Sequence, residues 1–175
     1  MIDEIMEYNR KFVENKGYEP YLTSKYPDKK LAILTCMDTR LLELLPAALG
    51  IKNGDAKIIK NAGGVIVHPY GSVVRSLLVG ILELGVEEVM VIGHTDCGVQ
   101  GMDGNEMLEK LVERGIDQQH IDIVRHSGID LERWLGGFES VESSVHETVR
   151  RLKEHPLMPK NVRISGFIMD SAPGS

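Results

Sequence analysis

Short apolar runs recur along the chain between stretches with a helical period, and these runs predict strands. Strands buried on both faces of a parallel sheet show such runs, because neither side of the sheet meets water. The runs occupy residues 31–35, 56–59 and 89–93, and a fourth strand is expected over residues 162–169. The third run is the clearest, since it reads Val-Met-Val-Ile-Gly.

Around these runs, apolar residues recur at intervals of three and four, which predicts amphipathic helices. The expected helices span residues 2–15, 41–49, 69–84 and 141–152, and residues 101–137 follow a helical pattern interrupted by glycines. Pro46 should bend the second helix or mark a fresh start, and Pro69 suits the first turn of the third. The third helix has a wide apolar face, so we expect it to be largely buried.

Strands that alternate with helices are typical of an α/β domain. We expect a mainly parallel central sheet, with a strand order beginning 2-1-3-4, flanked by helices. Residues 1–175 are expected to form a single domain, in which residues 1–30 make an N-terminal helical extension and a connector. Residues 61–64 read Asn-Ala-Gly-Gly, which predicts a loop where the backbone can approach a ligand closely.

Charge and composition narrow the class of protein. The net charge is −6 and basic residues do not cluster, so nucleic acid is not the expected partner. No apolar run approaches the roughly 20 residues that cross a bilayer, and the charged first 17 residues do not resemble a secretory signal. We therefore expect a cytoplasmic protein. Its two cysteines cannot make a disulfide framework, and in a reducing compartment they are metal-binding, catalytic or simply buried.

Both cysteines come directly after predicted strands. Cys36 follows the first strand, and His94 and Cys97 follow the third. If these strands are neighbours, their carboxyl ends form the topological switch point, where α/β proteins bind ligands. Two thiolates and one imidazole suit zinc, and three protein ligands leave the fourth position of a catalytic site open. The alternatives are packing, or a redox-active cysteine pair, which would lack the Cys-x-x-Cys spacing and leave the histidine unexplained.

A carboxylate and a guanidinium follow the first candidate ligand. Asp38 could accept a hydrogen bond from zinc-bound hydroxide and so orient it for attack. Arg40 would keep that carboxylate ionised and in position, because guanidinium binds carboxylate bidentately. The alternative is a surface ion pair of little energetic value. The Asp38–Arg40 pair follows directly after the candidate ligand Cys36 in the sequence, and this position favours the functional interpretation.

The two motifs together resemble the signature of the β-class carbonic anhydrases, in their small prokaryotic branch. Cys-x-Asp-x-Arg stands after the first strand, and His-x-x-Cys stands after the third. The resemblance covers at least residues 31–101 and includes the Asn-Ala-Gly-Gly segment between the motifs. Either motif alone is weak, whereas the pair is specific.

The resemblance implies a site, a cofactor and a reaction. Cys36, His94 and Cys97 would hold one zinc ion per chain, and Asp38 and Arg40 would be the catalytic pair. The implied enzyme is a carbonate dehydratase, a zinc lyase. It would hydrate carbon dioxide reversibly to bicarbonate and a proton by means of zinc-bound hydroxide.

The resemblance also implies assembly and leaves two other functions open. Family members are dimers or larger, with active sites at the subunit boundary and N-terminal helices lying over the partner. Residues 2–15 could do this, although a helix packed on its own chain is equally allowed. The same fold can carry a carbon disulfide or carbonyl sulfide hydrolase, and a non-catalytic zinc-binding paralogue is a third possibility. The Asp38–Arg40 pair would have no purpose in that third protein.

Overall fold

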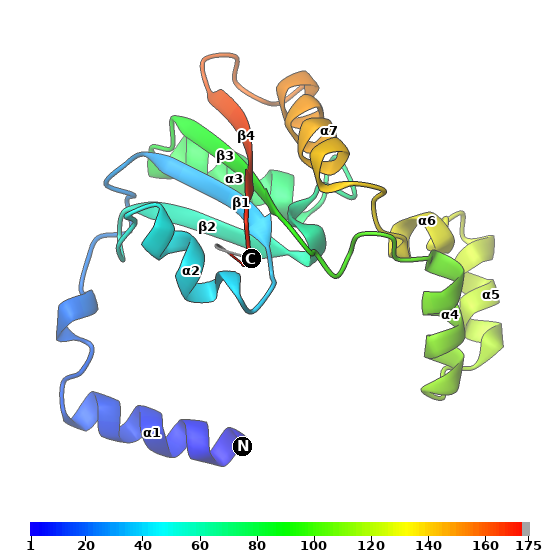
Figure 1. The fold of residues 1–175 in the computed structure, drawn as a ribbon, viewed down its shortest axis with the longest axis horizontal. Coiled ribbons are helices and arrows are strands. Elements are labelled where there is room, and N and C mark those ends of the chain that lie inside the picture. The colour runs from blue at the N-terminus through cyan, green and yellow to red at the C-terminus, as the bar shows by residue number, and fades with distance from the viewer. Residues whose placement is uncertain (173–175) are drawn as a thin grey trace.

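The core of the protein is a four-stranded, all-parallel sheet, seen in a computed structural model that describes residues 1–172 (Figure 1). The strands are β1 (Leu31–Cys36), β2 (Ala56–Asn61), β3 (Glu88–His94) and β4 (Arg163–Met169). They lie in the order β2-β1-β3-β4, and every neighbouring pair is parallel. The predicted fold class and strand order are therefore confirmed.

The register of the strands brings their carboxyl ends to one edge of the sheet. Leu31 at the start of β1 pairs with Ala56 of β2 and with Glu88 of β3. The strands then run in step, so β1 ends at Cys36 beside the end of β3 at His94. The last residues of β1 and β3, which are distant in sequence, therefore lie side by side at this edge of the sheet.

Helices connect the strands and extend from both sides of the sheet (Figure 1). They are α1 (Ile2–Glu14), α2 (Leu41–Ala48), α3 (Ser72–Leu84), α4 (Gly104–Glu113), α5 (Gln118–His126), α6 (Leu131–Leu135) and α7 (Val141–Glu154). Short 3-10 turns occupy Glu19–Tyr21 and Ala62–Gly64. The interrupted pattern over residues 101–137 corresponds to the three helices α4 to α6.

Two predictions for the third helix, its start and its burial, were wrong. Helix α3 begins at Ser72 rather than at Pro69, because the preceding residues close a turn in which the Gly71 N–H donates to the His68 carbonyl at 3.0 Å. Its apolar face is also only partly covered, since Leu82 is 68% exposed. Pro46 lies inside α2, which continues through it without a fresh start.

Apolar side chains cover both faces of the sheet. Successive strand residues point to opposite faces. Leu34 of β1 belongs to the buried cluster that contains Leu77 of α3, whereas Ile33 belongs to the cluster that contains Leu41 of α2. Helix α7 lies directly on β3, because a Cβ at Gly93 would come within 2.7 Å of a Val145 methyl carbon. The strand ends are therefore fixed by packing on both sides.

Two parts of the chain extend away from this core (Figure 1). Helix α1 contains no buried residue and lies apart from the sheet. Helices α4 to α6 form a separate lobe with a small apolar cluster of Leu108, Ile121 and Leu131. Within residues 1–172, none of the helices is both long and apolar enough to cross a membrane.

Candidate metal centre

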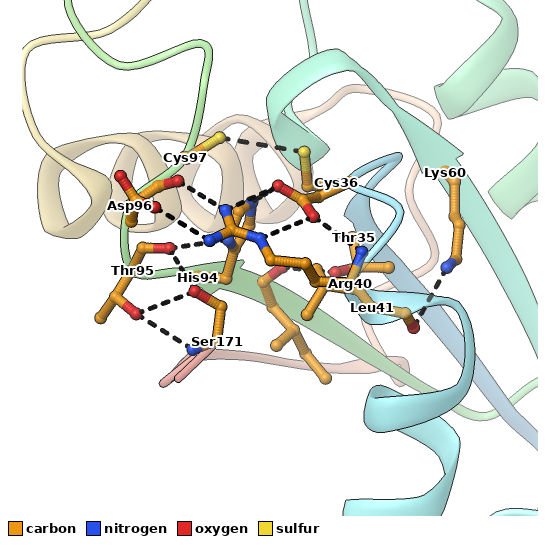
Figure 2. Close-up of polar contacts among 12 residues, drawn as sticks. Thr35, Cys36, Arg40, Leu41, Lys60, His94, Thr95, Asp96, Cys97 and Ser171 are labelled. Carbon is orange, nitrogen blue, oxygen red and sulfur yellow. Dashed lines mark hydrogen bonds and ion pairs between the residues drawn. The ribbon is translucent and has the colours of Figure 1, made fainter. Parts of the chain in front are cut away.

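Three metal-binding side chains meet at the carboxyl edge of the sheet (Figure 2). Cys36 is the last residue of β1, His94 is the last residue of β3, and Cys97 follows three residues later. Their ligand atoms all lie within 4.8 Å of one another, and the two sulfur atoms are 3.8 Å apart. All three side chains are buried. The structure thus brings together the residues that the switch-point argument selected.

The glycine loop between the two motifs holds the end of β1 in place. Gly64 has a φ of +64°, and a Cβ there would lie 2.8 Å from the carbonyl carbon of Thr35 and 2.9 Å from the nitrogen of Cys36. Only glycine allows both this conformation and this approach. The loop was predicted to allow a close approach of the backbone to a ligand; in the structure its glycine approaches the main chain that carries Cys36.

The hydrogen bond of His94 leaves one ring nitrogen available to a metal. Its Nδ1 lies 2.8 Å from the carbonyl oxygen of Thr95, which can only accept, so Nδ1 carries the hydrogen. The neutral ring then has its lone pair on Nε2. That nitrogen is buried and has no hydrogen-bond partner within residues 1–172. Metal-binding histidines are commonly oriented by such a bond from the other nitrogen.

The chemistry of the donor set fits a zinc ion. Burial, together with the neighbouring Cys36 sulfur, raises the pKa of the Cys97 thiol. A cation between the two sulfurs would reverse this effect, because it stabilises both thiolates. The same ion would satisfy the unpartnered Nε2 of His94. Two sulfurs and one nitrogen suit zinc and leave the fourth tetrahedral position open.

Asp38 and Arg40 form a bidentate ion pair beside these three residues. Arg40 Nε donates to Asp38 Oδ1 at 3.0 Å, and Nη2 donates to Oδ2 at 2.8 Å. The Arg40 main-chain N–H also donates to Oδ1, at 2.9 Å. These bonds hold the pKa of the Asp38 carboxyl well below its usual range. Asp38 Oδ2 lies 3.9 Å from His94 Nε2, so the carboxylate faces the candidate metal ligands.

Asp96 also binds Arg40, and no role was predicted for it from the sequence. Arg40 Nη1 donates to Asp96 Oδ2 at 2.9 Å, and Nη2 donates to the Asp96 carbonyl oxygen at 2.7 Å (Figure 2). Its place inside the His-x-x-Cys motif was the one available signal. That signal did not reveal that the side chain reaches the other motif.

A second network ties this loop to the end of β4, and it was also missed. The Ser171 hydroxyl donates to the Thr95 carbonyl at 2.8 Å, which is the same oxygen that accepts from His94 (Figure 2). The Ser171 N–H donates to the Thr95 hydroxyl oxygen at 3.0 Å. The Thr95 hydroxyl donates to Asp170 at 3.0 Å. The acceptor that orients His94 is thereby fixed from the neighbouring strand.

Comparison with known proteins agrees with this geometry. The carbonic anhydrase family matches residues 31–175. A Bacillus subtilis protein named "Putative carbonic anhydrase YvdA" is 51% identical over 173 residues, which cover 99% of this chain and 88% of that protein. A carbon disulfide hydrolase from Saccharolobus solfataricus is 33% identical over 155 residues, covering 82% of this chain and 74% of the hydrolase.

A solved structure extends the comparison to the fold. The β-carbonic anhydrase isoform I of Trichomonas vaginalis has a TM-score of 0.88 at 34% identity, and the match covers 100% of this chain and 94% of that one. Sequence, fold and the cluster of two cysteines and one histidine agree. The chain belongs to the β-class carbonic anhydrase family.

Proposed function

We propose that this protein catalyses the reversible hydration of carbon dioxide to bicarbonate and a proton. The observation that carries the proposal is a three-ligand metal site with an ionised carboxylate facing it. A site that only stabilises the fold is closed by four protein ligands, whereas a catalytic zinc site keeps one position open. The family match supports the same conclusion.

Cys36, His94 and Cys97 would hold one zinc ion per chain. A bound zinc ion would act as a Lewis acid and lower the pKa of a coordinated water towards neutrality. The chain keeps His94 in the required tautomer through the Thr95 carbonyl. It also keeps the ligand side chains buried, which excludes competing water from the sulfurs.

Asp38 and Arg40 would act as a unit on the reacting oxygen. An ionised carboxylate can only accept hydrogen bonds, so Asp38 would orient an O–H group whose lone pair then points at carbon dioxide. The two bonds from Arg40 hold Asp38 ionised and restrict its rotation. Their value lies in this orientation, because Arg40 is 40% exposed and an exposed ion pair stabilises the fold little.

Carbon disulfide hydrolysis is a second candidate, because several relatives with that name are 30–33% identical to this chain. The two candidates are separated by measuring kcat/KM for carbon dioxide, carbon disulfide and carbonyl sulfide on one zinc-analysed preparation. We expect rapid hydration of carbon dioxide and little turnover of the sulfur compounds. The reverse preference would establish the second candidate. No turnover of any substrate at full zinc content would indicate a non-catalytic paralogue.

We also propose a homodimer or a higher homo-oligomer, working in the cytoplasm. Helix α1 supports the assembly, since Ile2, Ile5, Met6 and Val13 on it are more than half exposed. An apolar face of this kind is commonly covered by a partner. The two free, buried cysteines support the location, because cysteines commonly remain unpaired in a reducing compartment.

A further inference from the structure

The guanidinium of Arg40 is held from two sides (Figure 2). It directs two N–H groups at the Asp38 carboxylate. It directs two more at Asp96, one to the side-chain carboxylate and one to the main-chain carbonyl. Four of its five N–H groups are therefore occupied, and Asp96 accepts half of these bonds.

The two acceptors have different consequences for the geometry of the site. Asp38 and Arg40 are two residues apart between β1 and α2, so the bonds within this pair do not join it to any other segment. Asp96 belongs to the loop after β3, between His94 and Cys97. Its contacts with Arg40 therefore join the pair directly to the loop that carries two of the three candidate ligands.

The backbone of Asp96 is shaped for this contact. Asp96 has a φ of +52°, in the left-handed region that few residues other than glycine, asparagine and aspartate adopt readily. In this conformation both its carbonyl oxygen and its carboxylate reach the same guanidinium. A residue with a branched Cβ could not take this conformation without strain.

We infer that Asp96 is a positioning residue, which anchors the Asp38–Arg40 pair to the loop that carries His94 and Cys97. Its kinetic consequence depends on the proposed function, whereas its structural consequence does not. Asp96 has a side-chain exposure of 87%, so its ion pair adds little to the stability of the fold. Its role is to limit the positions that Arg40, and through it Asp38, can occupy.

Two substitutions separate the side-chain contact from the backbone. Asp96→Gly keeps the left-handed conformation and the carbonyl acceptor but removes the carboxylate. Asp96→Asn keeps the conformation and a neutral acceptor oxygen, so it should restore part of the contact. Glu109→Gln is the matched control, because it removes one exposed carboxylate from α4, away from the strand ends.

The first readout is the hydrogen exchange of the Arg40 Nε–H, measured by nitrogen-15 NMR on zinc-loaded protein at one pH. The signal is identified by its loss in Arg40→Ala. We expect exchange about fivefold faster in Asp96→Gly, the size that follows from losing one exposed hydrogen bond, and a smaller change in Asp96→Asn. Glu109→Gln should match the wild type. Unchanged exchange in Asp96→Gly would show that Asp38 alone holds Arg40 and would overturn the inference.

The second readout is a double-mutant cycle on carbon dioxide hydration at equal zinc content. Asp96→Gly should lower kcat about threefold to tenfold and change KM less than about twofold, as expected for the loss of one hydrogen bond that orients the reacting group. In the Arg40→Ala background it should have no further effect, because its target is gone. Equal losses in both backgrounds would overturn the inference. A wild-type protein without hydration activity would contradict the proposed function instead, and the exchange measurement would still decide the role of Asp96.

Discussion

The two charges of the Asp38–Arg40 pair lie beside the candidate metal ligands. Arg40 is partly exposed, and Asp38 is mostly covered beside the buried ligands. Three hydrogen bonds from Arg40 offset the free-energy cost of partly burying the Asp38 carboxylate. Removing the Arg40 side chain would leave the Asp38 carboxylate charged, but the side-chain bonds that orient it would be lost.

Arg40→Ala should therefore lower turnover by about tenfold to a thousandfold, the range for removal of one positioned electrostatic contact. Thermal stability should change little, because the ion pair is partly exposed. The control is Arg75→Ala, which removes an exposed arginine from α3. Stopped-flow hydration at equal zinc content measures the effect. A wild-type rate in Arg40→Ala would show that Arg40 is an ordinary surface residue.

The lowered pKa of Asp38 makes a prediction about pH. Its ordinary pKa is about 3.9, and Arg40 moves the folded value below this. The pair therefore stabilises the fold fully above about pH 4, and this contribution is lost as the pH falls through the folded pKa. Carbon-13 NMR of the Asp38 carboxyl should show no titration between pH 5 and pH 9. An inflection in that range would contradict the assigned contacts.

Turnover should nevertheless rise across neutral pH and be greatest on the alkaline side. Two thiolate ligands would cancel the charge of a zinc ion, so this site would acidify water less than three neutral histidines would. Since Asp38 stays ionised, it cannot be the group responsible for this rise. The pH–rate profile at constant zinc content measures it. A profile that falls from pH 6 to pH 9 would contradict this account.

The sequence revealed the candidate ligands and the Asp38–Arg40 pair because each stands at a fixed distance from a strand end. It did not reveal the contacts of Asp96 and Ser171. Their contacts join segments that are 56 and 76 residues apart, and such contacts depend on the register of the sheet. The local amino-acid sequence of either segment does not specify these contacts.

At the scale of elements, the glycine loop and the end of β1 are one structural unit. Gly64 packs on the main chain between Thr35 and Cys36, where no Cβ can fit. Gly85 also has a positive φ, of +76°, but a Cβ there would meet no atom within 4 Å. A substitution at Gly85 therefore tests backbone strain alone, whereas one at Gly64 tests strain together with crowding.

Gly85→Ala should lower the free energy of unfolding by about 1–2 kcal/mol, the cost of the left-handed conformation. Gly64→Ala should cost about 1–3 kcal/mol more, because the added methyl group must displace the strand end. It should also weaken zinc binding, since Cys36 moves with that strand end. Urea unfolding and zinc analysis test both variants. Equal stability of the two would show that the close approach at Gly64 has no energetic consequence.

The strands were predictable because short apolar runs are typical of strands in a parallel sheet. Their order was predictable because a doubly wound sheet commonly places its first strand between the second and the third. Helix boundaries were less predictable. The start of α3 depends on a turn in which the Tyr70 N–H donates to the ring of His68, at 3.0 Å. The broken pattern over residues 101–137 gave no boundaries, because the lobe has a small core of its own.

At the scale of the whole molecule, helix α1 stands apart from the rest of its own chain (Figure 1). The structure does not show the alternative in which it packs on its own sheet. Phe12 is the exception on this helix, because its ring lies near Tyr21, with centroids 6.3 Å apart. Ile5 and Met6, by contrast, are 60% and 56% exposed.

Ile5→Glu should weaken self-association at least about tenfold, since burying an isoleucine stabilises an interface by about 1.5–3 kcal/mol. Glutamate is a good helix former, so α1 itself should persist. Lys11→Gln, on the opposite side of the helix by its spacing, should leave association unchanged. Sedimentation velocity over a concentration series measures both. A wild-type protein that is monomeric and fully active at assay concentration would contradict the proposed assembly.

The central claim is that zinc held by Cys36, His94 and Cys97 makes this chain a carbon dioxide hydratase. The most direct measurement is stopped-flow hydration of carbon dioxide during stepwise return of zinc to metal-free protein. We predict a rate that rises in proportion to bound zinc and stops rising at one ion per chain, while Cys97→Ser binds little zinc and stays inactive. Full zinc binding without hydration, or the same activity without zinc, would contradict the account.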